Sequence, residues 1–73
     1  MTTNNLQQLA KVLDAESYEW LAAHHPTIAD AVEASVGAGA TPAEIRLFVL
    51  RQTGRIEIAL RCEAAARHVG RAE

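Results

Sequence analysis

The stretch Thr41-Pro42-Ala43-Glu44 decides the fold, because it marks the beginning of a helix more specifically than any other part of the chain. Thr41 is suited to cap a helix N-terminus, and Pro42 fits the first helical position, where its missing N–H costs no hydrogen bond. Glu44 can reach back to the Thr41 amide and complete a capping box. The Gly-Ala-Gly-Ala run at 37–40 supplies the backbone freedom that ends a preceding helix. The pattern predicts two helices joined by a turn.

The helix predicted over 42–53 is strongly apolar, and Gly54 ends it. Its apolar residues are Ile45, Leu47, Phe48, Val49 and Leu50. This face is wider than one packing partner needs, so part of it is left for other contacts. A last helix is predicted over 55–69, because apolar residues recur there at helical spacing and Gly70 can stop it. Those residues are Ile58, Cys62, Ala65, Ala66 and Val69.

Two further helices are predicted before the Gly-Ala run. Over residues 4–24, apolar side chains recur at helical spacing, and Ser17 continues the stripe between Leu13 and Trp20. The apolar members are Leu6, Leu9, Ala10, Leu13, Trp20 and Leu21. Asp14 can cap a second start, so the segment is either one helix or two helices broken near residue 14. Pro26 forces His25 out of helical geometry and opens a helix over 26–36.

Composition is typical of a single globular domain. The 73 residues are 49% hydrophobic and 22% charged, with a formal net charge of −2, which is apolar enough for a core. No segment alternates with period two for long enough to make a strand, and no linker divides the chain. We therefore expect an all-α fold, a compact bundle of three to four short helices in one domain spanning residues 1–73. A domain this small buries only about 60% of the surface of its unfolded chain, so self-association would add stability.

The sequence favours a cytoplasmic protein that does not associate with membranes. Cys62 is the only cysteine, so the chain holds no partner for a disulfide. Residues 1–8 are polar and lack the features of a signal peptide. No uncharged stretch approaches the roughly 20 residues that a membrane-spanning helix requires.

No constellation of residues points to catalysis, a metal or a cofactor. His24 and His25 are adjacent, and neighbouring helical residues point about 100° apart, so the two cannot easily share an ion. Cys62 lies on the inner stripe of its helix, where a free cysteine packs as a small hydrophobic residue. The Gly-Ala run lacks the lysine of a phosphate-binding loop. We expect no catalytic residue, no metal site, no cofactor and no enzymatic activity.

Nucleic-acid binding is one of two functions that the sequence leaves open. Residues 27–54 have the outline of a helix-turn-helix unit, in which the helix over 42–55 would contact DNA. Its candidate contacts are Arg46, Arg51, Gln52 and Arg55. Residues 41–73 carry six arginines and four acids, a charge of +2, whereas residues 1–40 carry one lysine and five acids, a charge of −4. The negative net charge and the long turn weigh against DNA binding.

The favoured function is that of a small non-enzymatic protein that binds or regulates another protein, as an adaptor, inhibitor or assembly subunit. Candidate contact residues lie beside or off the inward stripes of their predicted helices. They are Tyr18, Trp20, Leu47, Leu50 and Leu60. A second copy of the chain is one candidate partner, because the acidic first part and the basic last part would complement each other in a homodimer. The alternative for the same residues is burial within the bundle.

Overall fold

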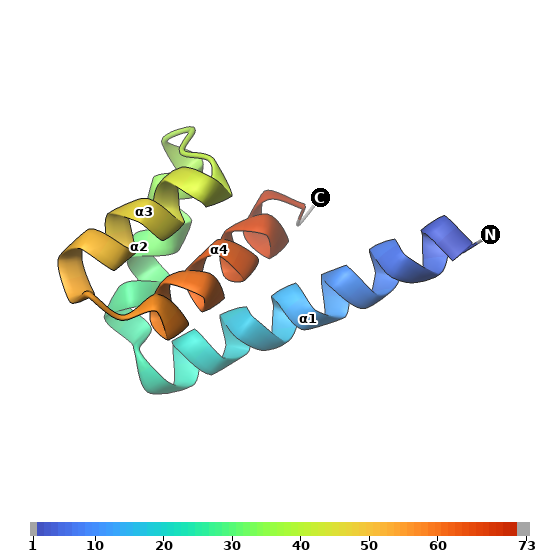
Figure 1. Ribbon diagram of the computed structural model, residues 1–73, viewed down its shortest axis with the longest axis horizontal. Coiled ribbons are helices and arrows are strands. Elements are labelled where there is room, and N and C mark those ends of the chain that lie inside the picture. Colours follow the sequence, from blue (N-terminus) through green and yellow to red (C-terminus); the bar gives the residue numbers. More distant parts are fainter. Residues whose placement is uncertain (1, 72–73) are drawn as a thin grey trace.

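Four helices make up nearly all of the chain that the structure, a computed structural model, describes (residues 2–71; Figure 1). They are α1 (Thr2–His24), α2 (Pro26–Gly37), α3 (Pro42–Thr53) and α4 (Ile56–Gly70). No strand occurs between residues 2 and 71. The predicted all-α fold of short helices is confirmed. The first segment is one continuous helix, with no break near residue 14.

Local hydrogen bonds explain where α3 begins and ends. The Thr41 hydroxyl accepts a hydrogen bond from the Glu44 amide at 3.2 Å, and the Glu44 carboxylate accepts one from the Thr41 amide at 2.8 Å. The bonds to Thr41 hold the pKa of the Glu44 carboxyl below its ordinary value. At the other end, Gly54 adopts a left-handed φ of 67°, and its amide donates to the Leu50 carbonyl. The predicted capping box and glycine stop are both present.

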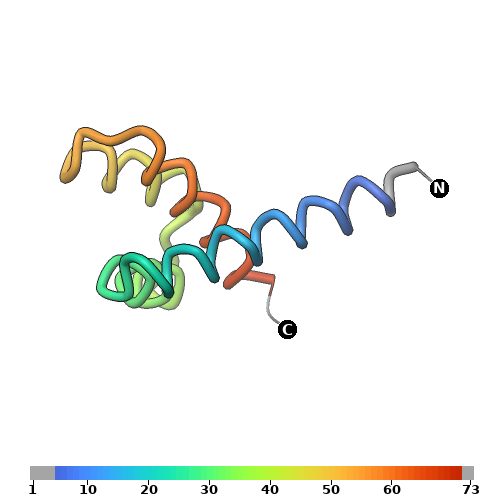
Figure 2. Tube along the Cα trace, turned by 90° about the horizontal axis from the view of Figure 1, so that it is seen from below, coloured from blue at the N-terminus to red at the C-terminus, as the bar shows by residue number. Residues whose placement is uncertain are grey.

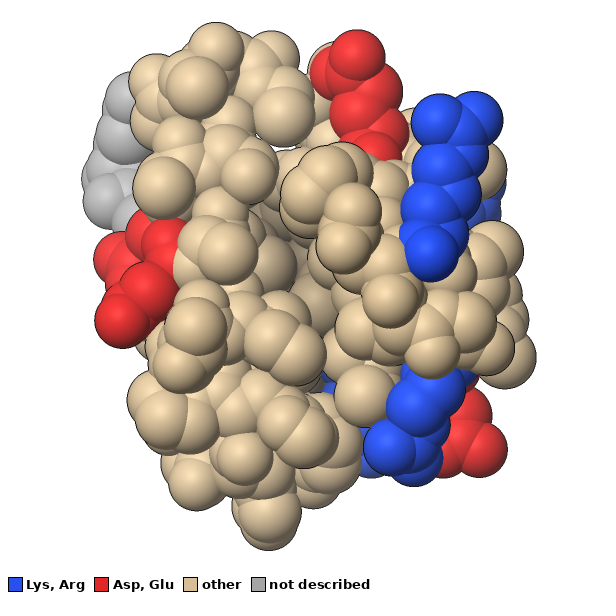
Figure 3. Space-filling view, turned by 90° about the vertical axis from the view of Figure 1, so that its left-hand side faces the viewer, with Lys and Arg blue, Asp and Glu red and all other residues tan. Residues whose placement is uncertain are grey.

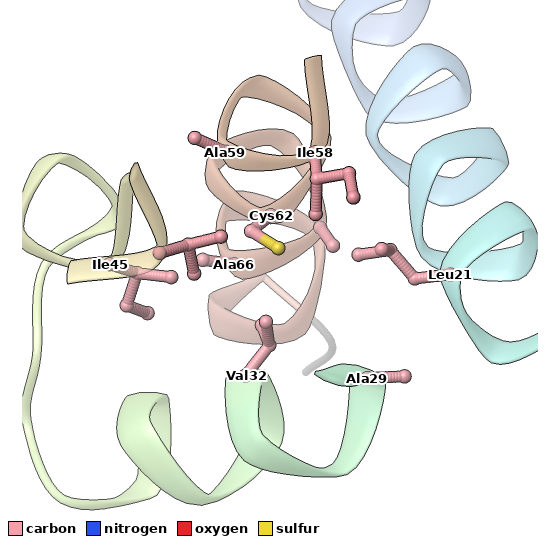
Figure 4. Packing of buried hydrophobic residues seen from close by; sticks show 10 residues of the cluster. Leu21, Ala29, Val32, Ile45, Ile58, Ala59, Cys62 and Ala66 are labelled. Carbon is pink, nitrogen blue, oxygen red and sulfur yellow. The ribbon is translucent and has the colours of Figure 1, made fainter. Parts of the chain in front are cut away.

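α4 is the central helix of the bundle (Figures 1 and 2). α1, α2 and α3 all pack on it, whereas α2 and α3 contact each other little. Half of the buried apolar residues come from α4, and several are alanines, which let the helices approach closely (Figure 4). The core consists of Leu21, Ala29, Val32, Ile45, Val49, Ile58, Ala59, Cys62, Ala65 and Ala66.

The two halves of α1 have different surroundings. The half from Asp14 to His24, which we call the anchored half, lies along α4. The half from Asn5 to Leu13, which we call the arm, projects beyond the bundle (Figures 1 and 2). Four large apolar side chains of the arm are each more than half exposed: Leu6, Leu9, Val12 and Leu13. The helical stripe seen in the sequence is therefore real, but most of its first half is not part of the core.

A buried carboxylate fixes the anchored half of α1 to α4. Asp14 is only 1% exposed and accepts a hydrogen bond from Arg67 at 3.2 Å and from Arg71 at 3.3 Å. Arg67 also pairs with Glu63, and Glu63 pairs in turn with Arg46 of α3. Paired guanidinium groups compensate the cost of burying the carboxylate, so the charges link α1, α4 and α3 in one network.

Candidate protein-binding surfaces

An uncharged groove lies between α2 and α3. α3 packs mainly on α4 and α2 packs on both α4 and α1, and the two helices leave a hollow of about 160 Å³ between them. Its lining comes in equal parts from the two helices and contains no charged residue: Thr27, Ile28, Ala31, Val32, Ser35, Ile45, Phe48, Val49, Gln52 and Thr53. The face of the molecule that carries α2 and α3 is hollowed and largely free of charge, with acidic and basic side chains at its margins (Figure 3). Apolar grooves of this kind accommodate apolar side chains of a ligand.

Phe48 is the most prominent side chain of this groove. It is 60% exposed, although Ile45 and Val49 on the same helix are buried. A second, more open hollow of about 440 Å³ lies beside the turn at 38–40, and Ser35, Ile45 and Phe48 line both hollows. The groove therefore continues along α2 toward the turn. The one charged residue of the second hollow is Glu44, whose carboxylate is already occupied by the Thr41 amide.

The arm is the second exposed apolar surface. Leu6, Leu9 and Leu13 are spaced i, i+3 and i+7, so they lie along one side of the helix, and Val12 flanks them. The opposite side of the arm faces the end of α4, where Gln7 and Lys11 line a shallow hollow together with Arg71. The arm thus has one polar side near the bundle and one apolar side with nothing over it among residues 5–71.

The predicted contact residues differ in how much surface they offer. Tyr18, Trp20 and Leu50 are partly buried against the core. Leu47 and Leu60 are each 49% exposed and remain open to contact. Of the predicted contact residues, Leu47 and Leu60 are therefore more accessible than Tyr18, Trp20 and Leu50.

Polar contacts account for the positions of the two aromatic residues of the anchored half. The Tyr18 hydroxyl donates to the Glu33 carboxylate at 2.6 Å, and this bond raises the pKa of Tyr18 above its ordinary value. The Trp20 ring stacks on His24, and the Arg61 guanidinium lies 4.2 Å from its centroid, a cation–π distance. These contacts hold both rings against the bundle.

The candidate DNA contacts are divided between two environments. Arg46 pairs with Glu63 at 3.3 Å, so part of its charge is already neutralised. Arg51, Gln52 and Arg55 are exposed near the end of α3. Gln52 also lines the α2–α3 groove. Of the candidate DNA contacts, Arg46 is therefore paired with an acidic residue, whereas Arg51, Gln52 and Arg55 are open to solvent.

The candidate metal and thiol residues are engaged elsewhere. His24 Nδ1 lies 3.0 Å from the Trp20 carbonyl oxygen, and His68 lies against Tyr18. In the described part of the chain, no three His, Cys, Asp or Glu side chains come together as metal ligands. Cys62 is fully buried, and this burial raises the pKa of its thiol to about 11, so the reactive thiolate is scarce at neutral pH.

Sequence reasoning missed Phe48 as a surface residue and the leucines of the arm as exposed. The signal for Phe48 was the width of the apolar face of α3, which exceeds what one neighbouring helix can cover. For the arm, the signal was the length of α1, 23 residues against 15 in α4. A helix that is longer than its packing partner leaves part of its stripe uncovered.

Comparison with known proteins gives no relative for this arrangement. No family model matches the sequence, and neither the curated proteins nor the solved structures contain a match. No helix among residues 2–71 is both long enough and apolar enough to span a membrane.

Proposed function

We propose that this chain is a non-enzymatic protein-binding domain whose α2–α3 groove holds an amphipathic helix of a partner protein. The observation that carries the proposal is the exposure of Phe48 above an uncharged, apolar groove. A domain of this kind acts as an adaptor, inhibitor or assembly subunit. Aromatic residues that close over a desolvated pocket commonly contribute most of the binding energy of such an interface.

The chemistry of the groove favours a helix as the occupant. The groove follows two neighbouring helices and is lined by small and branched apolar side chains such as Ile28, Ala31 and Val32. A helix that carries apolar residues at i, i+3 or i+4, and i+7 presents one continuous ridge to such a groove. The polar lining residues, including Thr27 and Gln52, can satisfy the partner's polar edges without selecting for charge.

The same features favour a protein partner over nucleic acid. No lysine or arginine lines the groove, whereas phosphate neutralisation by basic residues supplies most nonspecific DNA affinity. Arg46, the first of the candidate DNA contacts on α3, pairs with Glu63. The net charge of −2 also opposes approach to a polyanion.

The test is selection of helical peptides on the folded domain. A display library of amphipathic helical peptides is selected on the wild-type chain, and binding of the selected peptides is measured by fluorescence anisotropy. Phe48→Glu is expected to weaken binding at least about tenfold, because it places a charge in an apolar groove. Ile56→Glu is the matched control, since the Ile56 side chain is also half exposed but lies at the start of α4 and does not line the groove.

Both variants must keep the helical circular dichroism of the wild type, which their exposure predicts. Peptides that bind the wild type and Phe48→Glu with equal affinity would contradict the proposal. Failure to enrich any peptide would contradict it as well. A duplex DNA probe at low salt that binds the wild type, and loses affinity in an Arg51→Ala/Arg55→Ala variant, would assign the chain to the alternative class instead.

A further inference from the structure

We propose that the α2–α3 groove selects a partner helix that carries one basic and one acidic side chain, two turns apart, beside its apolar ridge. The inference rests on the proposed function, because it names the charge pattern of the helix that the groove holds. Two exposed residues of opposite charge carry it: Glu44 and Arg51, which flank Phe48 on α3.

Glu44, Phe48 and Arg51 form one stripe along α3, which we call the lip. Their spacing of i, i+4 and i+7 places them on the same side of the helix. Phe48 lines both hollows and Glu44 lines the more open one, so the lip borders the groove along its length. Gln52, the neighbour of Arg51 in the chain, lines the groove near the end of α3. The lip is therefore acidic at one end, aromatic in the middle and basic at the other end.

Both charges of the lip are available to a partner. The Oε1 atom of Glu44 accepts from the Thr41 amide at 2.8 Å, and Oε2 accepts no hydrogen bond from residues 2–71. A carboxylate can accept several hydrogen bonds at once, so the cap leaves room for a second donor. Arg51 takes part in none of the ion pairs found in the described part of the chain, in contrast to Arg46.

The other side of the groove adds no charge. The α2 residues that line it are uncharged. The acidic residues of α2 act on α1 instead, because the hydrogen bond from Tyr18 to Glu33 and, more weakly, the charge of Asp30 raise the pKa of Tyr18. The lining therefore selects the apolar ridge of a partner helix, and the lip alone selects its charges.

The length of the lip sets the spacing of the partner's charges. Glu44 and Arg51 are seven residues apart, about 10 Å along α3 at 1.5 Å per residue. A helix that lies along the groove has the same rise, so a base and an acid seven positions apart meet both residues together. A helix with the same charge at both positions meets a like charge at one end, whichever way it lies.

Charge changes on the lip and on the peptide test the inference together. Peptides selected on the wild type are expected to be enriched in a base and an acid seven positions apart. Arg51→Glu should weaken binding of such a peptide about five- to tenfold, because it turns an attraction into a repulsion. Replacing the acid of the peptide with lysine should restore binding to this variant. Glu44→Gln keeps an acceptor for the capping box and should weaken binding about two- to threefold.

Lys11→Glu is the matched control for Arg51→Glu. It changes the net charge by the same amount at an exposed position of the arm, outside the groove, and should bind the peptide as the wild type does. All variants must keep the helical circular dichroism of the wild type. An equal loss of affinity in Lys11→Glu and Arg51→Glu would assign the effect to net charge and overturn the inference.

The remaining outcomes separate this inference from the proposed function. If the peptides lose affinity for Phe48→Glu but bind Arg51→Glu as tightly as the wild type, the groove is the binding site and the lip does not select charge. Selected peptides without the paired charges lead to the same conclusion. If no peptide is enriched, or if Phe48→Glu binds as tightly as the wild type, both proposals are wrong.

Discussion

The anchored half and the arm of α1 belong to one continuous helix. In each half, one residue has the opposite burial from the one that its polarity would suggest. Asp14, a charged residue, is almost completely buried in the anchored half, whereas Leu9 in the arm is more than half exposed. Both positions lie within one and a half turns of each other along the same helix. Burial in this small domain is therefore decided by where the neighbouring helix ends as much as by the hydrophobicity of the side chain.

The end of α4 sets the boundary between the two halves. α4 stops at Gly70, and Arg71 directly after it reaches Asp14. Beyond this point α1 has no helix beside it (Figure 1). Two predictions test how sharply the two halves differ, and a third tests the core that the anchored half covers; they are ordered by the size of the expected effect.

A matched pair of leucine substitutions gives the largest difference. Leu21→Ala should lower the free energy of unfolding by about 2–5 kcal/mol, because Leu21 is fully buried and its loss leaves a cavity. That is a large part of the roughly 4–11 kcal/mol expected for a domain of this size. Leu9→Ala should change the free energy of unfolding by less than about 0.5 kcal/mol. Both variants are measured by urea denaturation at concentrations where the chain is monomeric. Similar losses for the two variants would abolish the distinction between the halves.

Substitution of the buried carboxylate gives the next largest effect. Asp14→Asn should destabilise the fold by about 1–3 kcal/mol, since the amide oxygen can accept from only one of the two guanidinium groups and the amide NH2, a donor, faces the other. Arg67 and Arg71 remain partly exposed and can be solvated, which limits the cost. Glu16→Gln, an exposed site on the same helix, is the control and should change stability by less than about 0.5 kcal/mol. If Asp14→Asn leaves the free energy of unfolding unchanged, packing alone anchors α1.

The smallest effect develops only at high pH. Cys62 lies in the core near Leu21 and Val32 (Figure 4), and its pKa rises from 9.0 to about 11 on folding. Because the folded state favours the protonated thiol, its contribution to stability is complete below pH 9 and is lost as pH rises through about 11. Urea midpoints measured between pH 8 and pH 11 should fall less steeply in Cys62→Ala than in the wild type. If the urea midpoints of the two proteins fall equally steeply with pH, the Cys62 thiol lies in a more solvated environment than the buried position described above.

Helix boundaries were the part of the structure most accessible from sequence, because they depend on neighbouring residues. Thr41 and Glu44 form the cap that their spacing predicted, and Gly54 ends α3 as expected. Pro26 begins α2, with His25 outside helical geometry before it. Each of these signals acts within a few residues, so periodicity and capping rules were sufficient.

Tertiary placement depended on contacts that the local pattern does not contain. Arg67 and Arg71 lie more than 50 positions from Asp14 in the chain, so their pairing leaves no trace in the spacing of nearby residues. For the same reason, the apolar stripe of α1 did not indicate where the neighbouring helix α4, which packs on it, ends. On α3, Phe48 looked like a core residue because sequence cannot show that α2 and α3 lie apart.

The placement of the groove and the arm at opposite ends has a consequence for multivalent binding. Two chains linked by a synthetic tether between their arms would present two grooves at the ends of an elongated particle. A partner with two matching helices on a linker long enough to reach both ends would then bind with avidity, because the second contact forms at high effective concentration. With a shorter linker, the same partner would gain nothing from its second helix and would instead bridge separate particles.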